Sequence, residues 1–242
     1  MSISLKDRVC IITGAGRGIG AGIAQGFTKR GAVVIATDRD TPTLEGVAAN
    51  MTWDVSDPAA AEAVVADVVK QFGRVDAFVA NAGIYPQQPW QDVSQEDWRN
   101  VVGVNLDGAW YGAQAVAKPM TAAGYGKIVF VSSVEILIGV AHHAHYSSAK
   151  AGLVGLTRSL SRALGPAGVR VNTLMPGAVL TEGELEQFPD QAAAAKLLAE
   201  RQCLPHRLLP EGIEPTFAFL CAQESDAITG QVLNVDHGLV HY

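Results

Sequence analysis

Two side chains that could move a proton lie one helical turn apart in the stretch HYSSAK. Tyr146 precedes Lys150 by four residues, and on a helix this spacing places both on one face. A free tyrosine has a pKa of about 10, so it exchanges protons poorly at neutral pH. A lysine ammonium beside it favours the phenolate and lowers that pKa. A tyrosine and a lysine at this spacing also occur together by chance. The interpretation of Tyr146 as a general acid/base therefore needs other motifs in the chain to support it.

A glycine-rich segment near the N-terminus, TGAGRGIG at 13–20, could hold a phosphate. Gly14, Gly18 and Gly20 follow an expected strand and open an expected helix. Glycines permit a tight turn and a close approach of the backbone to a ligand, and a helix N-terminus attracts a pyrophosphate. The segment therefore predicts a dinucleotide site.

An acidic residue, Asp38, ends the second expected strand, 18 residues after Gly20. A carboxylate at this point accepts hydrogen bonds from the adenosine ribose and repels a 2′-phosphate, so it favours NAD over NADP. Arg17 and Arg39 oppose this interpretation, because either guanidinium could bind a phosphate. We give Asp38 more weight, since its charge would lie closest to the 2′ position. The alternative is a surface aspartate at a strand end.

Short apolar runs alternate with helix-length segments along the chain. The alternation predicts a parallel sheet with right-handed crossovers, and the nearly continuous apolar character of the strands indicates burial on both faces. Asp57 can cap a helix that begins at Pro58, and Ser94 can begin another. Any helix between Asp38 and Asp54 must be stunted. The seven expected strands are residues 8–13, 32–37, 51–55, 75–80, 127–132, 169–174 and 231–236.

Composition narrows the class of partner. The chain has 242 residues, a net charge of −6 and no cluster of Lys and Arg, which argues against nucleic acid or an anionic membrane as a partner. No apolar run approaches the ~20 residues of a membrane span, and the start lacks a signal-peptide pattern. Three widely spaced cysteines indicate a reducing setting and no metal site built on cysteine. We expect a cytoplasmic protein.

Together these features resemble the short-chain dehydrogenase/reductase family, in its single-domain branch with a Tyr-x-x-x-Lys centre. The resemblance implies an α/β, Rossmann-like, doubly wound and mostly parallel seven-stranded sheet with helices on both faces. It implies one NAD(P)-binding domain over 1–242, with a substrate flap around 176–210, and a homotetramer. Its motifs are TGAGRGIG (13–20), DV (54–55), NAG (81–83), NLDG (105–108), SS (132–133), YSSAK (146–150), PG (176–177) with Thr181, and ITGQVLNVD (228–236).

The resemblance also implies the roles of individual residues. Tyr146 would be the catalytic acid/base, and Lys150 would lower its pKa and bind the nicotinamide ribose. Ser133 would hold the substrate oxygen, and Asn105 would anchor a water in a proton relay. The expected cofactor is NAD, and its expected contacts are Gly14, Arg17, Gly18, Ile19, Gly20, Asp38, Asp54, Val55, Asn81, Ala82, Gly83, Tyr146, Lys150, Pro176, Gly177, Val179 and Thr181.

The loop before Tyr146 carries His142, His143 and His145. A metal site is the weaker interpretation, because hydride transfer needs no metal and acidic ligands are missing, so we expect none. Loop histidines, or one that faces the substrate, are favoured. Glu135 either points near the pocket or is a solvated loop charge. Tyr85 and Trp90 either wall the pocket or pack structurally.

We expect an NAD-dependent alcohol dehydrogenase or ketoreductase acting on a small polar secondary alcohol or ketone of the sugar, polyol or hydroxy-aromatic type. The expected substrate contacts are Ser133, Glu135, His143 and Tyr146. One alternative is an NADPH-dependent 3-oxoacyl reductase, which Asp38 disfavours. Another is a non-catalytic dinucleotide-binding sensor, which the presence of all four catalytic residues disfavours.

Overall fold

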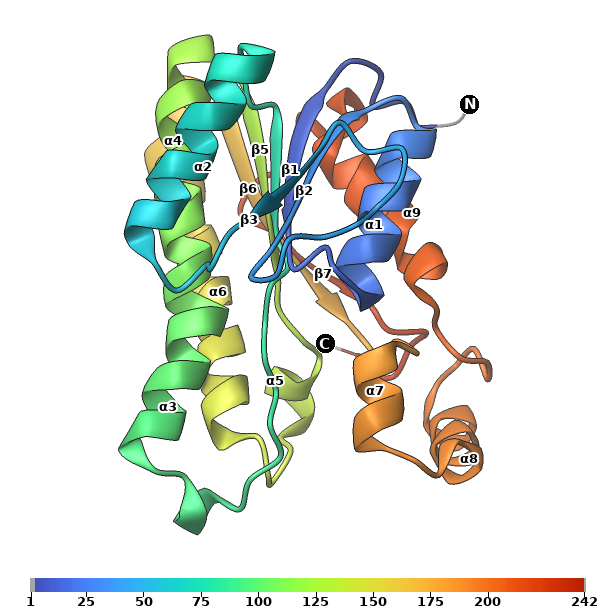
Figure 1. Cartoon of the computed structure of the whole chain (residues 1–242). Coiled ribbons are helices and arrows are strands. Elements are labelled where there is room, and N and C mark those ends of the chain that lie inside the picture. The colour runs from blue at the N-terminus through green and yellow to red at the C-terminus, as the bar shows by residue number, and fades with distance from the viewer. Residues whose placement is uncertain (1–2, 242) are drawn as a thin grey trace.

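The computed structural model describes residues 3–241 as an α/β fold built on one seven-stranded sheet (Figure 1). All neighbouring strands run parallel, in the order β3-β2-β1-β4-β5-β6-β7. The order reverses between β1 and β4, and in such sheets ligands bind beyond the carboxyl ends of the strands at the reversal. The predicted fold is confirmed. The strands are β1 (Val9–Thr13), β2 (Val33–Asp38), β3 (Ala49–Thr52), β4 (Ala77–Ala80), β5 (Gly126–Val131), β6 (Val169–Pro176) and β7 (Val232–Val235).

Helices cover both faces of the sheet (Figure 1). On one face, α1 (Gly18–Lys29) and α9 (Pro210–Cys221) pack against one apolar cluster. On the other, α2 (Pro58–Phe72), α4 (Gly108–Ala123) and α6 (Ala144–Leu164) pack against a second. Successive β1 residues alternate between the two clusters, so the strand must be apolar throughout, as its sequence is.

The two predicted helix starts are confirmed. Asp57 accepts a hydrogen bond from the Ala59 N–H at 2.8 Å, and Pro58 is the first residue of α2. Ser94 and Asp97 form a reciprocal capping box at the start of α3 (Gln95–Val102). Among the described residues, β2 and β3 are joined without a helix. The third strand runs over 49–52, earlier than the predicted 51–55. The Trp53 N–H still donates to the Asp38 carbonyl at 2.7 Å, and the chain turns at 55–56.

A widened, π-helical turn at Gly103–Asp107 joins α3 to α4 and contains Asn105. Such turns interrupt the regular hydrogen-bond ladder and frequently occur at functional sites. The remaining short elements are α5 (Glu135–Ile138) and the single turns Trp90–Asp92, Gly165–Ala167 and Gln223–Ser225.

The segment 176–210, predicted as a flap, contains two capped helices. Thr181 accepts a hydrogen bond from the Glu184 N–H at the start of α7 (Glu182–Gln187), and Asp190 accepts one from Ala193 at the start of α8 (Gln191–Arg201). Both helices lie beyond the carboxyl ends of the strands (Figure 1). Movement of this flap stays a prediction.

Two further sequence expectations concern cysteines and membranes. Cys10 and Cys221 are buried free thiols, and Cys203 is an exposed one. Burial raises the pKa of Cys10 and of Cys221, so both thiols stay protonated and inert. Over residues 3–241, none of the helices combines the length and apolar character that a bilayer crossing requires.

Candidate active site

A cavity of about 1210 Å³ lies at the carboxyl ends of the strands, where the strand order reverses. This volume exceeds the ~300–1,000 Å³ of an ordinary small-molecule pocket, so it can take a dinucleotide and a substrate together. Most predicted site residues line it. Gly20 and Asn105 are the two that lie behind its wall. Those in the wall are Gly14, Arg17, Gly18, Ile19, Asp38, Asp54, Val55, Asn81, Ala82, Gly83, Ser133, Glu135, His143, Tyr146, Lys150, Pro176, Gly177, Val179 and Thr181.

The glycine loop is packed so closely that side chains would not fit. A Cβ on Gly20 would lie 2.1 Å from the Gly14 carbonyl oxygen. Gly14 itself has a φ of 64°, and a Cβ there would lie 2.7 Å from Ala82 Cα. The Asn81 side chain ties the loop to β4 by donating to the Thr13 and Gly14 carbonyls at 2.9 and 3.0 Å. This tight turn before α1 is the cradle that a pyrophosphate requires.

Asp38 is fixed at the end of β2 by backbone amides. The Gly16 N–H donates to Oδ2 at 2.9 Å, and the Arg39 N–H donates to Oδ1 at 2.7 Å. A Cβ on Gly16 would lie 2.9 Å from Asp38 Oδ2, so a larger residue here would push the carboxylate aside. The sequence analysis missed Gly16, although it lies between two glycines of the loop. Farther along the wall, hydrogen bonds from Ser56 hold the pKa of Asp54 below its usual range.

Tyr146 and Lys150 lie one turn apart at the start of α6, as predicted. Lys150 is 4% exposed, its Nζ donates to the Val131 carbonyl at 2.8 Å, and it lies 5.7 Å from the centre of the Tyr146 ring. Ser133 lies two residues after β5, where its Oγ accepts a hydrogen bond from the Glu135 N–H at 3.2 Å. The site therefore brings a phenol, an ammonium and a hydroxyl into one wall.

The titration of this pair differs from the sequence-based expectation. Burial raises the pKa of Tyr146 well above its ordinary value, and the Glu135 carboxylate raises it further. Burial also lowers the pKa of Lys150 to about 8. In the ligand-free chain burial therefore dominates the pKa of Tyr146, and the expected lowering by Lys150 together with a bound oxidised nicotinamide stays a prediction.

Asn105 is 1% exposed and is held by two hydrogen bonds, from its Nδ2 to the Ile84 and Val101 carbonyls at 2.8 and 2.9 Å. Its Oδ1 is buried without a partner among the described residues. A Cβ on Gly83 would lie 2.6 Å from this oxygen and 3.2 Å from Lys150 Nζ. A side chain at position 83 would therefore crowd both the amide oxygen and the ammonium.

Glu135 and His143 form a pair beside the tyrosine. Glu135 Oε2 lies 2.7 Å from His143 Nδ1, and the His143 ring packs edge-on against Tyr146 with centroids 5.6 Å apart. His143 is 2% exposed, His145 is fully buried and accepts a hydrogen bond from the Tyr146 N–H, and His142 is exposed. Over residues 3–241, no three His, Cys, Asp or Glu side chains converge as a metal site would require.

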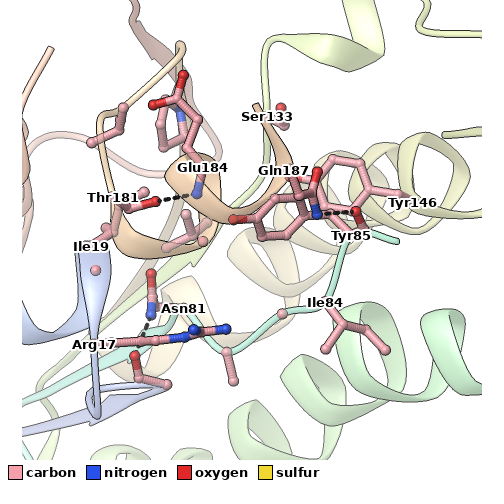
Figure 2. Close-up of a pocket in the computed structure, with 18 of the residues that line it drawn as sticks. Arg17, Ile19, Asn81, Ile84, Tyr85, Ser133, Tyr146, Thr181, Glu184 and Gln187 are labelled. Atoms are coloured by element: carbon pink, nitrogen blue, oxygen red, sulfur yellow. Dashed lines mark hydrogen bonds between the residues drawn. The ribbon is translucent and has the colours of Figure 1, made fainter. Parts of the chain in front are cut away.

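Helix α7 closes the opposite side of the cavity (Figure 2). Gln187 Nε2 donates to the Tyr85 carbonyl at 2.9 Å, and the Tyr85 ring lies 6.0 Å from that of Tyr146. Trp90 is 69% exposed and lies outside this wall. The sequence analysis missed the α7 residues, because their contacts join segments more than a hundred residues apart.

The geometry and the sequence agree with one family. A family model described as enoyl-(acyl carrier protein) reductase matches residues 14–240. The chain belongs to the short-chain dehydrogenase/reductase family. Members use a nicotinamide dinucleotide, and the glycine cradle found here, with Asp38 beside it, fits such a group. The chain is thus an oxidoreductase of this family.

Individual relatives cover nearly the whole chain. A Rhizobium meliloti protein named as a probable galactose dehydrogenase is 34% identical over 97% of this chain and 96% of its own length. L-rhamnose 1-dehydrogenase (NAD(P)(+)) of Azotobacter vinelandii is 34% identical over 97% of each chain. A 3-oxoacyl-(acyl-carrier-protein) reductase of Thermotoga maritima is 35% identical over 98% and 99%.

A solved structure matches the short-chain dehydrogenase/reductase fold seen here. A Sinorhizobium meliloti protein assigned to the short-chain alcohol dehydrogenases superposes with a TM-score of 0.90 at 30% identity. The match covers 99% of this chain and 98% of that one. The doubly wound architecture is therefore shared over the full length.

Proposed function

We propose that the chain is an NAD-dependent dehydrogenase that interconverts a small polar secondary alcohol and its ketone. One observation carries this proposal: a single cavity joins the glycine loop and Asp38 to Ser133, Tyr146 and Lys150. The sugar dehydrogenases among the relatives support a sugar or polyol. A hydroxy-aromatic alcohol also belongs to the proposed class of small polar substrates.

Asp38 supports NAD as the cofactor. Its carboxylate is held in place by two amides at the end of β2, where it would accept hydrogen bonds from ribose hydroxyls. The loop glycines and Thr181 would bind the rest of the dinucleotide, and Asp54 and Val55 would lie at its adenine end. When bound, the nicotinamide supplies the hydride chemistry, and the protein supplies orientation and proton transfer.

The proton path runs through residues of this chain. The Ser133 hydroxyl and the Tyr146 phenol would both hydrogen-bond the substrate oxygen, and Tyr146 would take its proton in oxidation or give it in reduction. Lys150 and the positive charge of an oxidised nicotinamide would together stabilise the phenolate. A water bound by Lys150 and the Asn105 oxygen would carry the proton outward.

The wall around Tyr146 supports a polar substrate. Glu135 and His143 stand beside the phenol, and an acyl chain would strip water from such a pair without replacing its hydrogen bonds. A second candidate, a 3-oxoacyl reductase, is favoured by one observation. The α8 residues Leu197 and Leu198 line the cavity, and Leu197 is 48% exposed, so an apolar chain could pack there.

A substrate screen distinguishes the polar-alcohol dehydrogenase from the 3-oxoacyl reductase. The chain would be assayed with sugars, polyols, hydroxy-aromatic alcohols, unfunctionalised secondary alcohols and a 3-oxoacyl thioester, each with NAD(H) and NADP(H), following reduced-nicotinamide absorbance. We expect the largest kcat/KM for a hydroxylated alcohol with NAD. Fastest turnover of the thioester with NADPH would favour the second candidate, and no turnover with any pair would refute both.

We also propose a homotetramer in a cytoplasmic setting. Exposed small residues on α6, Ala151 and Gly155, would let a helix of another copy approach closely, and Trp110 on the neighbouring helix α4 is 38% exposed. Light scattering on the purified protein would give the mass, and a monomer at micromolar concentration would contradict the assembly.

A further inference from the structure

Helix α7 contacts the glycine loop through two carboxylates. Arg17 Nη1 donates to Glu186 Oε1 at 2.9 Å, and the Gly18 N–H donates to Glu182 Oε2 at 3.1 Å. Helix α1 begins at Gly18 and has no acid of its own in its first turn. The flap therefore supplies the negative charge that the start of a helix attracts.

Arg17 lies next to the group that would recognise the adenosine ribose. Its neighbour Gly16 donates to Asp38 Oδ2 at 2.9 Å, and Arg17 and Asp38 line the same cavity. A guanidinium binds a phosphate through two parallel hydrogen bonds. An unpaired Arg17 would therefore suit a 2′-phosphate and would offset the repulsion from Asp38.

We propose that Glu186 is a positioning residue for cofactor choice. By pairing with Arg17 it withholds that guanidinium from a 2′-phosphate, and so adds to the NAD preference that Asp38 sets. This inference rests on the proposed function, since it requires a nicotinamide dinucleotide in the cavity. Both partners are 64% exposed, so the pair has the modest strength of an exposed ion pair, and its effect is a few-fold.

The other arginine at this end of the cavity offers a contrast. Arg39 reaches Asp40 at 4.0 Å, with side chains 78% and 94% exposed, and this pair lies within one loop. Of these two arginines in the described part of the chain, Arg17 is the one that pairs with a carboxylate of α7, so Arg17 is the residue through which Glu186 must act.

The test is a double-mutant cycle, measured as the ratio of kcat/KM for NADPH to kcat/KM for NADH. Glu186→Gln should raise this ratio about threefold to fivefold through a lower KM for NADPH, with kcat unchanged. In an Arg17→Met background, the same change should leave the ratio unaltered. Glu186→Asp keeps the charge and should return the ratio towards that of the parent.

A matched control separates this effect from general charge. Glu200→Gln removes the same charge from an exposed position of α8 and should leave the ratio unchanged. An equal rise with Glu200→Gln, no rise with Glu186→Gln, or a rise that persists without Arg17, would overturn the inference. Thermal melts check folding, and Glu186→Ser replaces Glu186→Gln if the latter melts early.

Failure of the proposed function gives a different result. If the unmodified chain binds neither NADH nor NADPH, measured by quenching of tryptophan fluorescence, the function is refuted whatever the variants do. If it binds NADH and turns over an alcohol while the Glu186 ratios stay flat, only the inference about Glu186 is wrong.

Discussion

The Lys150 ammonium nitrogen lies 5.7 Å from the centre of the Tyr146 ring and donates a hydrogen bond to the Val131 carbonyl at 2.8 Å. The lysine thus stands beside the phenol in a buried wall. Burial keeps Tyr146 protonated at neutral pH, because it raises the pKa of the phenol. Ketone reduction can use this proton directly. Alcohol oxidation needs more positive charge beside the phenol, which an oxidised nicotinamide would add.

Replacement of Tyr146 by Phe tests the assignment of the acid/base. The variant Tyr146→Phe keeps the ring but loses the exchangeable proton, so kcat should fall at least ~10²-fold while NADH still binds. Tyr111→Phe, at a half-buried position of α4 outside the cavity, is the control and should retain activity. Near-normal kcat in Tyr146→Phe would show that another group carries the proton.

The buried charge of Lys150 should destabilise the folded state of the ligand-free protein. Its folded pKa of about 8 lies below the ordinary 10.5, so the unfolded chain binds more protons between these values and stability rises with pH across that window. Below pH 8 the penalty is complete, and 1.36 kcal/mol per pKa unit limits it to about 3 kcal/mol. Lys150→Met should therefore raise Tm at pH 7, by at most about 6–12 °C at ~2–4 °C per kcal/mol, and abolish turnover.

The Lys150→Met gain has a pH signature. Because Lys150 itself becomes neutral above its folded pKa, the difference in Tm between variant and parent should shrink as pH rises from 8 towards 10. Melting curves followed by circular dichroism across this range measure it. A variant that melts below the parent at pH 7 would mean that the lost hydrogen bond to Val131 matters more than the buried charge.

Features encoded locally were predictable from the sequence. The strands are short β-rich runs, and Asp57 and Ser94 cap their helices through contacts within three residues. The four-residue spacing of Tyr146 and Lys150 predicted that both side chains lie on one face of the helix. The helices of the flap escaped notice, although Thr181 and Asp190 stand where N-caps are expected, because the Gly, Pro and Ala content of the segment resembled a loop.

Features that depend on tertiary packing were not predictable. Glu186 meets Arg17 across 169 positions of the chain, and nothing local to either residue indicates the other. The upward direction of the Tyr146 pKa shift also depends on tertiary packing. The spacing to Lys150 is local, whereas the burial that dominates the shift is produced by the surrounding fold.

Asp38 should set most of the cofactor preference. NAD should exceed NADP at least ~10-fold in kcat/KM, since one repulsive contact of ~1.4 kcal/mol suffices for that. Asp38→Ala should narrow the gap, because it removes the repulsion near the 2′ position. Asp67→Ala, at an exposed position of α2 outside the cavity, is the charge-matched control. Equal use of NAD and NADP by the unmodified protein would contradict this prediction.

Gly83 should be required for a proton relay between Lys150 and Asn105. A Cβ there would lie 2.6 Å from Asn105 Oδ1 and 3.2 Å from Lys150 Nζ, so Gly83→Ala would crowd both groups and any relay water bound by them. We expect kcat to fall ~10-fold or more, because the proton loses its route away from Tyr146. Gly103→Ala is the control, since its Cβ would meet no atom within 4 Å.

Steady-state and single-turnover rates would distinguish the outcomes for Gly83→Ala. A relay defect slows the proton step while NADH binding persists. Loss of NADH binding together with a lower Tm would instead mean that the added methyl displaces the loop after β4, and that Gly83 is needed for packing. Unchanged kcat would remove the relay from the mechanism.

Glu135 should act on both the substrate and the phenol. Its Oε2 is held by His143 Nδ1 at 2.7 Å, and the side chain is 27% exposed in the cavity wall, so a carboxylate edge can meet a substrate hydroxyl. Losing that contact in Glu135→Ala should cost ~1–3 kcal/mol in kcat/KM on a polyol. An unfunctionalised secondary alcohol lacks the second hydroxyl and should lose much less.

The charge of Glu135 gives a second, independent readout. The carboxylate raises the pKa of Tyr146, so Glu135→Gln, which removes the charge, should shift the pH profile of alcohol oxidation to lower pH. The sign follows because a less anionic surrounding stabilises the phenolate. The profile is measured as kcat/KM across pH 6–10 on both substrates. Equal losses on polyol and simple alcohol, or none on either, with an unmoved profile, would mean that Glu135 is an ordinary loop charge and that the polar-substrate proposal has lost its main support.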